Sequence, residues 1–208
     1  AEDRSVILQA TTKTPVADFI GTFGMPNLDK LGVILRIPEY AENANITISK
    51  QERNGENVPV GIAFSNANGD FKNDYRFMAS EIINEKLKTV KMREVNWGIN
   101  FEPTIASIQR FKFMISANME ETTFIAKTEN NDLKFFFGDH STHAGNFVFQ
   151  PDVGGKLERA WSWPVEQVSK ILSLGGDTTF KFSVDGGAES VVDRGVAEYR
   201  SFLPAQSK

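Results

Sequence analysis

The sequence contains no cysteine. Disulfide frameworks, thiol catalysis and most structural zinc sites are therefore excluded, and the absence fits a cytosolic protein. No stretch approaches the roughly 18 apolar residues of a membrane span. The first residues, AEDRSVILQATT, lack the basic-then-apolar order of a secretory signal. The sequence also lacks an initiator methionine, so we expect it to begin inside a longer protein.

Signatures of catalysis are equally scarce. The sequence has no GxxxxGK[ST], GxSxG or HExxH motif, and no pair of carboxylates stands out for acid–base work. His140 and His143 lie beside Asp139 in GDHSTHAG, at a spacing that fits two metal ligands. No helix is predicted to orient the pair, so we interpret the segment as a polar loop. We therefore predict no enzyme, no metal site and no cofactor.

Positive charge is also in short supply. The chain has 23 Lys and Arg against 27 Asp and Glu, a net charge of −4. A protein that binds DNA on an open surface through electrostatic attraction normally needs a basic surface. The balance of charged residues therefore argues against a conventional DNA-binding domain. It still allows a protein that gathers its few cations on one face.

Phenylalanine is abundant, with 17 copies against 3 Trp and 3 Tyr, and aromatic residues at alternating spacing favour sheet. The main signal is internal repetition. Three segments, beginning at Asp18, Asn96 and Leu157, share one order: a short strand, a proline, an amphipathic helix of about three turns, then several strands. A generic α+β protein is the alternative, because strands joined by a helix are common.

The last copy shows the pattern most clearly. Pro164 ends a strand and suits the first turn of a helix, and TTFKFSVDGG then alternates into a hairpin turn. In each copy, residues at helical spacing predict one buried stripe. These are Leu28, Leu31, Ile34 and Leu35 in the first helix, Ile105, Ile108, Phe111 and Ile115 in the second, and Val165, Val168, Ile171 and Leu172 in the third.

The domain organisation follows from the repeat. Residues 1–14 resemble the last strand of a preceding copy that is absent, and Ser80 to Val95 lies between copies as a connector with one or two helical turns. We predict an N-terminal domain over 1–83 with its first half largely missing, a connector over 84–95, and a C-terminal domain over 96–208.

This pattern resembles the sliding clamps, in particular those of T-even-type phages and their marine relatives. The residues that carry the resemblance are WPVEQVSKILSL, TTFKFSVDGG and VAEYRSFLPA, within a match over about Asp18 to Gln206. The resemblance implies the α+β DNA-clamp (processivity) fold, in which repeated βαβββ units place sheets outside and helices around a ring. It also implies a homotrimer when full length, although the missing first half puts a ring of this chain in question.

The resemblance implies a non-enzymatic clamp that encircles duplex DNA without base readout and raises polymerase processivity. Its partners would be duplex DNA, a DNA polymerase and a clamp loader, in the cytoplasm of an infected bacterium. Neighbouring subunits would pair through exposed edge strands. Two other functions stay open: a structural or tail-associated β-rich phage protein, and a small enzyme whose site forms only in the fold.

We expect the DNA-facing residues on the polar sides of the three helices. At about 100° per residue, Arg110 and Lys170 each lie on the side of the helix opposite the apolar stripe. The two residues occupy equivalent positions when the helices are aligned on their first apolar residues. Lys112, Lys30 and Arg36 lie on or beside such faces, whereas Asp29 and Glu166 reduce the positive charge there. Any amphipathic helix carries cations on its solvated side, which is the plainer explanation. The connector cations Lys86, Lys88, Lys91 and Arg93 are assigned to solvation rather than to nucleic acid.

Overall fold

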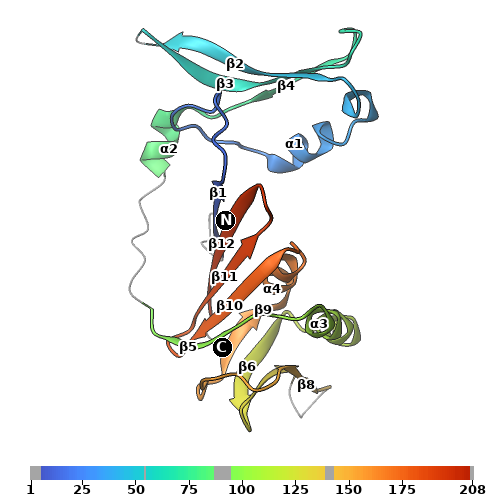
Figure 1. The fold of residues 1–208 in the computed structure, drawn as a ribbon, viewed down its shortest axis with the longest axis vertical. Coiled ribbons are helices and arrows are strands. Elements are labelled where there is room, and N and C mark those ends of the chain that lie inside the picture. Colours follow the sequence, from blue (N-terminus) through green and yellow to red (C-terminus); the bar gives the residue numbers. More distant parts are fainter. Residues whose placement is uncertain (1–5, 54, 87–94, 139–142, 207–208) are drawn as a thin grey trace. The chain divides into compact units, whose positions relative to one another are not determined.

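The computed structural model describes residues 6–53, 55–86, 95–138 and 143–206. The chain divides into two compact units (Figure 1). The large unit comprises residues 1–14 and 93–208, and the small unit comprises residues 15–92. Among the described helices, none combines the length and the apolar character needed to cross a membrane.

Two successive βαβββ copies build most of the large unit, as the repeat predicts. The first copy consists of β5 (Trp97–Phe101), α3 (Ile105–Ala117), β6 (Thr123–Glu129), β7 (Asp132–Phe137) and β8 (Gly145–Gln150). The second consists of β9 (Trp161–Pro164), α4 (Val165–Leu172), β10 (Asp177–Ser183), β11 (Gly187–Asp193) and β12 (Ala197–Pro204).

The two copies exchange their first strands. β5 pairs with β10 of the second copy, and β9 pairs with β6 of the first. The result is a five-stranded sheet of order β1-β12-β11-β10-β5 and a four-stranded sheet of order β8-β7-β6-β9. Neither copy therefore completes a sheet by itself.

The strand β1 (Ile7–Thr12) belongs to the large unit. It pairs with β12 from Ile7 opposite Phe202 to Thr12 opposite Ala197. The sequence-based division grouped residues 1–14 with the N-terminal domain. The structure places β1 in the large unit instead, because the outer edge of β12 offers backbone hydrogen bonds along the whole of β1. The order of residues along the chain does not show which strand has such a free edge.

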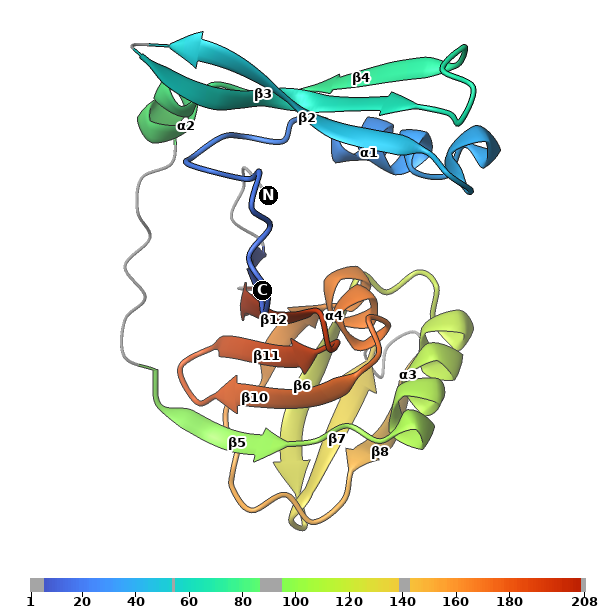
Figure 2. The same cartoon turned by 45° about the horizontal axis from the view of Figure 1, so that its top comes forward.

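Phenylalanine side chains from both sheets of the large unit form one core cluster. The helices α3 and α4 are neighbours along one side of this unit (Figure 2). Phe135 stacks on Phe149 at 4.3 Å between ring centroids, and Phe182 meets Trp163 edge-on at 4.8 Å. Phe111 of α3 is fully buried among these rings. The aromatic alternation of the sequence therefore reflects one shared core.

Short turns close the hairpins where the sequence predicts them. Asn130 and Asn131 have φ of 52° and 70° between the paired residues Glu129 and Asp132. Two consecutive positive φ values are the mark of a type I′ turn, whose twist matches the flanking strands. Asn adopts this conformation more readily than other non-glycine residues.

The small unit places one helix against a three-stranded sheet. Its elements are α1 (Leu28–Ile34), the 3₁₀ helix η1 (Pro38–Tyr40), β2 (Asn45–Arg53), β3 (Glu56–Ser65), β4 (Lys72–Arg76) and α2 (Ser80–Lys86). The sheet order is β2-β3-β4, and Leu31 and Ile34 of α1 pack against Ile62, Phe64 and Tyr75. Burial raises the pKa of the Tyr75 hydroxyl, which donates to the carbonyl of Pro26.

Two details of the small unit differ from expectation. The strand predicted before α1 is reduced to a single bridge between Gly24 and Met78, because Gly21 turns the chain with φ of 84°. The connector begins with the short helix α2, within the predicted one or two turns. Residues 87–94, which include Lys88, Lys91 and Arg93, lie outside the described residues.

The predicted buried stripes are wrong at three positions at or beside the ends of α1 and α3, whereas both ends of α4 are buried as predicted. Ile105, Leu28 and Leu35 are 81%, 61% and 59% exposed, whereas the stripe residues between the helix ends are buried or half-buried. Ile105 and Leu28 are the first residues of α3 and α1, and Leu35 is the C-cap of α1. Residues at the ends of these two helices fit the helical spacing of the predicted stripe, but the helix no longer contacts the core there.

The core assignment yields a stability prediction on one helix. Phe111→Ala removes a fully buried ring, so we expect the free energy of unfolding to fall by about 3–5 kcal/mol. The matched control is Phe113→Ala, two residues away and 70% exposed, for which a change within about 0.5 kcal/mol is expected. Urea unfolding followed by circular dichroism measures both. Equal effects of the two substitutions would contradict the packing of α3.

Candidate nucleic-acid interface

Helix α3 is rich in positive charge for its length. It contains Arg110 and Lys112 but no Asp or Glu. Thr104 caps its N-terminus by accepting a hydrogen bond from the Ser107 amide at 3.0 Å. The cap and the buried Phe111 fix how the helix lies on the core. Its two cations are therefore held on a defined surface with no acid on the same helix to neutralise them.

Arg110 lies on the side of α3 nearest to β8. It is about 100° around the helix from the buried Phe111, and its guanidinium carbon sits 5.4 Å from the centroid of the Phe147 ring. This contact orients the side chain and leaves its charge in solvent, since Arg110 is exposed. The residue is thus accessible, although it does not point directly away from the core.

The outward face of α3 is uncharged. Gln109 and Phe113 lie on the side opposite the buried residues, and Phe113 is 70% exposed. Arg110 and Lys112 flank this face, one on each side. A polyanion lying along α3 would thus meet a cation at either edge and an uncharged strip between them.

Lys170 of α4 is neutralised by its own helix. Its ammonium donates to Glu166 Oε1 at 2.5 Å, and both side chains are mostly exposed. The hydrogen bond from Lys170, and then its charge, hold the pKa of Glu166 below the ordinary value. The pair has no net charge near neutral pH, so α4 adds little to the positive potential of this surface.

The helix α1 contributes two cations, Arg36 just after its C-terminal end and Lys30 within the helix. Arg36 follows α1 and donates from Nε to the carbonyl of Gly32 at 3.0 Å, a favourable place for a cation. Lys30 is exposed on α1 next to Asp29. Within the described residues, neither Lys30 nor Arg36 has a carboxylate at ion-pair distance, and the same holds for Arg110 and Lys112.

Cations on the strands of the large unit are compensated instead. Glu129 binds both Lys127 and Lys134, at 2.7 Å and 3.1 Å. Glu189, whose side chain is only 6% exposed, binds Lys181 at 2.7 Å and Arg200 at 3.5 Å. The described cations on the strands of the large unit thus each have a carboxylate partner, whereas four of the five predicted DNA-facing cations remain uncompensated on or beside the helices.

The structure brings only part of the predicted site together. Arg110, Lys112 and Lys170 lie on the neighbouring helices α3 and α4 of the large unit. Lys30 and Arg36 belong to the small unit. Asp139 and His140 lie outside the described residues, and the part of the chain that is described holds no cluster of three potential metal ligands.

The sequence analysis missed one feature of the helix surface. The Glu166–Lys170 ion pair was readable from its i,i+4 spacing, which favours such pairs. The predicted stripe includes Phe111 and leaves out Phe113, in agreement with the burial of the first ring and the exposure of the second.

The chain is similar in fold to two solved PCNA structures. PCNA from Thermococcus kodakaraensis matches with a TM-score of 0.57 and 11% identity, over 86% of this chain and 71% of that one. A. fulgidus PCNA bound to the C-terminal region of FEN-1 matches with a TM-score of 0.50 and 11% identity, over 77% of this chain and 64% of that one. No protein-family model matches the sequence. No curated protein matches it either.

These similarities establish the fold. The chain has the α+β fold of the PCNA sliding clamps, which confirms the predicted fold class. At 11% identity they carry no information on individual residues, so the roles of Arg110, Lys112, Lys170, Lys30 and Arg36 remain predictions.

The ion pair on α4 makes a prediction about pH. Because a lowered pKa favours the charged carboxylate, the pair is intact above the ordinary pKa of Glu166 and is lost as the pH falls through the lowered value. In Lys170→Gln we expect the pKa of Glu166 to return towards the ordinary value. Carbon-13 NMR titration of the carboxyl groups measures this. Glu129, held low by Lys127 and Lys134, is the internal control and should not move.

Proposed function

We propose that this chain is the subunit of a sliding clamp that encircles duplex DNA and tethers a replicative polymerase to raise its processivity. The observation that carries the proposal is the PCNA-like fold together with the uncompensated cations Arg110 and Lys112 on α3. A clamp encloses DNA rather than gripping it, so scattered cations near the phosphates suffice and base contacts are unnecessary. A net charge of −4 is compatible with that mode of binding.

The proposed assembly is a homotrimer built through sheet edges. Among the described residues, β8 and β4 each have a strand on one side only, so both offer backbone groups to a neighbouring chain. Polymerase and clamp loader are the proposed protein partners. The A. fulgidus PCNA bound to the C-terminal region of FEN-1 supports partner binding of this general kind.

The proposed source is a T-even-type phage, with the protein acting in the cytoplasm of the infected bacterium and without enzymatic activity of its own. This rests on the sequence resemblance described above. A structural role in a phage tail is the competing function. It gives no reason for cations on α1 and α3 to remain unpaired while those on the strands of the large unit are compensated.

Charge reversal on α3 tests the DNA-facing surface. In Arg110→Glu/Lys112→Glu we expect stimulation of the replicative polymerase on primed circular DNA to fall by about tenfold, because the phosphates would meet repulsion at both edges of the helix. The matched control is Lys156→Glu/Arg194→Glu, which changes the net charge equally at exposed sites on loops of the same unit. Unimpaired stimulation by the α3 variant, with circular dichroism showing a folded chain, would contradict the assignment.

Removal of Glu166 should act in the opposite direction. Glu166→Gln leaves Lys170 as a free cation, so duplex DNA binding should strengthen at low salt, and the gain should shrink as salt rises. Fluorescence anisotropy with a labelled duplex, measured across a salt series, follows the effect. A gain that does not depend on salt would argue against an electrostatic origin.

The assembly is tested by mass. Light scattering across a concentration series should give about three times the mass of one chain if the chain closes a ring. A single-chain mass at every concentration would show that these 208 residues do not form the ring by themselves.

A further inference from the structure

The outward face of α3 carries an aromatic ring with no aromatic neighbour. Phe113 is 70% exposed and lies about 200° around the helix from the buried Phe111. In the described part of the chain its ring meets no other aromatic ring, whereas Phe111 packs edge-on against Phe124 and Phe135 in the core. Both faces of the Phe113 ring are therefore open to a ligand.

Free positive charge flanks this ring. Arg110 and Lys112 lie on the two sides of the helix, and neither has a carboxylate at ion-pair distance within the described residues. The Phe147 ring holds the Arg110 guanidinium at 5.4 Å from its centroid without neutralising it. The nearest acids along the chain, Glu102 and Glu120, lie beyond the two ends of the helix. The surroundings of Phe113 thus attract negative charge.

The uncharged strip of α3 continues from Phe113 towards the start of the helix. Gln109 and Ile105 precede Phe113 by four and eight residues, so they lie near it on successive turns. Both are exposed, Ile105 to 81%. The amide of Gln109 offers hydrogen-bond donors and an acceptor. A ligand along this strip would meet a ring, an amide and an aliphatic side chain over about 12 Å.

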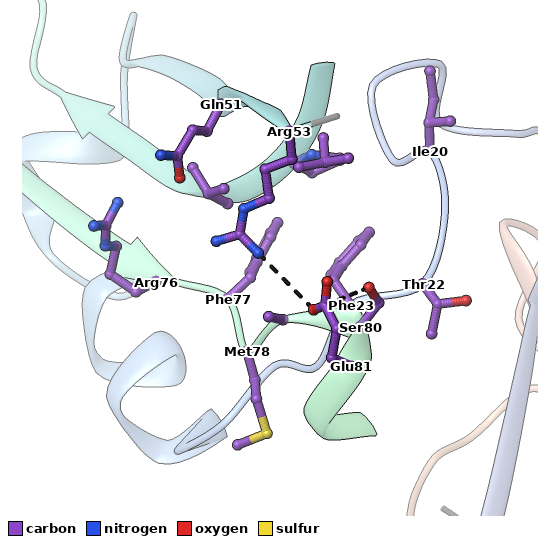
Figure 3. Close-up of a pocket in the computed structure, with 14 residues that line it drawn as sticks. Ile20, Thr22, Phe23, Gln51, Arg53, Arg76, Phe77, Met78, Ser80 and Glu81 are labelled. Carbon is purple, nitrogen blue, oxygen red and sulfur yellow. Dashed lines mark hydrogen bonds and ion pairs between the residues drawn. The ribbon is translucent and has the colours of Figure 1, made fainter. Parts of the chain in front are cut away.

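A second place in the chain combines arginines with aromatic rings, but its rings are already stacked (Figure 3). Arg53 and Arg76 line a pocket in the small unit where β4 ends. Arg53 Nη1 lies 4.0 Å from Glu81 Oε2, and Phe77 stacks on Phe23 with 4.4 Å between ring centroids. The outward face of α3 differs because its ring is unstacked and has an unpaired cation on either side.

A single strand of nucleic acid has the groups that fit this face. Its unpaired bases can stack on an aromatic side chain, and its phosphates attract cations. The free edge of an unpaired base can also exchange hydrogen bonds with an amide such as that of Gln109. In an intact duplex the bases already stack on one another and their edges are paired. The ring of Phe113 would then have no base face to contact.

We propose that the outward face of α3 binds unpaired bases and so prefers single-stranded DNA to duplex DNA. One base stacks on Phe113, and the phosphates on either side of that base bind Arg110 and Lys112. The inference deepens the proposed clamp function and rests on it for its setting, since a primed template has unpaired bases next to the duplex. The contact itself requires neither a polymerase nor a closed ring.

The test compares three DNA probes on the whole chain by fluorescence anisotropy. They are a labelled single strand of about 12 nucleotides, the duplex of the same sequence, and the same strand with abasic sites at its central positions. The abasic strand keeps every phosphate but lacks the bases. At one salt concentration the intact strand should bind about tenfold more tightly than the abasic strand, because stacking on an aromatic side chain strengthens binding by this order. It should also bind more tightly than the duplex.

Variants of α3 separate stacking from charge. Phe113→Leu keeps an apolar side chain but removes the ring, so the intact and abasic strands should bind equally; Phe113→Tyr should keep the difference. Phe71→Leu is the matched control, because it makes the same change at a phenylalanine of the small unit that is 41% exposed. Arg110→Glu/Lys112→Glu should weaken the binding of all three probes, since each carries phosphates. Circular dichroism confirms that each variant is folded.

Two results would overturn the inference. One is that the intact strand binds no more tightly than the abasic strand, or does not bind at all at low salt. The other is self-association of the chain, measured by light scattering, that Phe113→Leu abolishes. That result would assign the ring to a contact with a second copy of this chain.

Polymerase stimulation distinguishes this inference from the proposed function. If the chain stimulates the polymerase but does not distinguish the intact strand from the abasic strand, the clamp function stands and the inference is wrong. If the chain distinguishes the two strands but gives no stimulation, the inference stands and the clamp function is contradicted.

Discussion

The exchange of first strands between the two copies of the large unit is the constraint on which the rest of that unit depends. Because β5 completes the sheet of the second copy and β9 completes the sheet of the first, neither copy by itself supplies all the strands of its sheet. The same exchange brings Phe101 and Trp163 into one aromatic core with Phe182. It also explains why α3 and α4 come to lie side by side, since each helix directly follows an exchanged strand.

In the described part of the large unit, the cations of the strands are paired with acids, whereas those of α3 are not. Glu129 and Glu189 each hold two cations on the strands, and the nearly buried Glu189 depends on both partners for compensation. On α3 no acid is present, so Arg110 and Lys112 keep their charge available to solvent. The net charge of −4 is therefore an average over surfaces that differ in sign. It describes none of those surfaces, which is how an acidic chain can carry a candidate surface for DNA.

The small unit offers a second kind of surface, based on backbone groups and shape rather than charge alone. Its sheet is short, and β4 ends before β3 does, so the hairpin of β2 and β3 extends past its third strand. The chain fills part of that gap with the Phe23–Phe77 stack and the start of α2, and leaves the pocket beside them. The unpaired cations of α3 and the pocket beside β4 thus belong to different elements in different units.

The sequence by itself determined the repeat, the α+β class and the positions of most strands and helices. The reason is that alternation, helical periodicity and turn residues such as Asn130 and Asn131 act over a few neighbouring residues. It did not reveal the exposure of Ile105, nor the side of α3 on which Arg110 lies, since these depend on how the helix is seated on the core. The pairing of β1 with β12, the strand exchange and the pocket beside β4 were decided only by tertiary structure. Each of them joins segments far apart in the chain through backbone hydrogen bonds and ring contacts that leave no local pattern in the sequence.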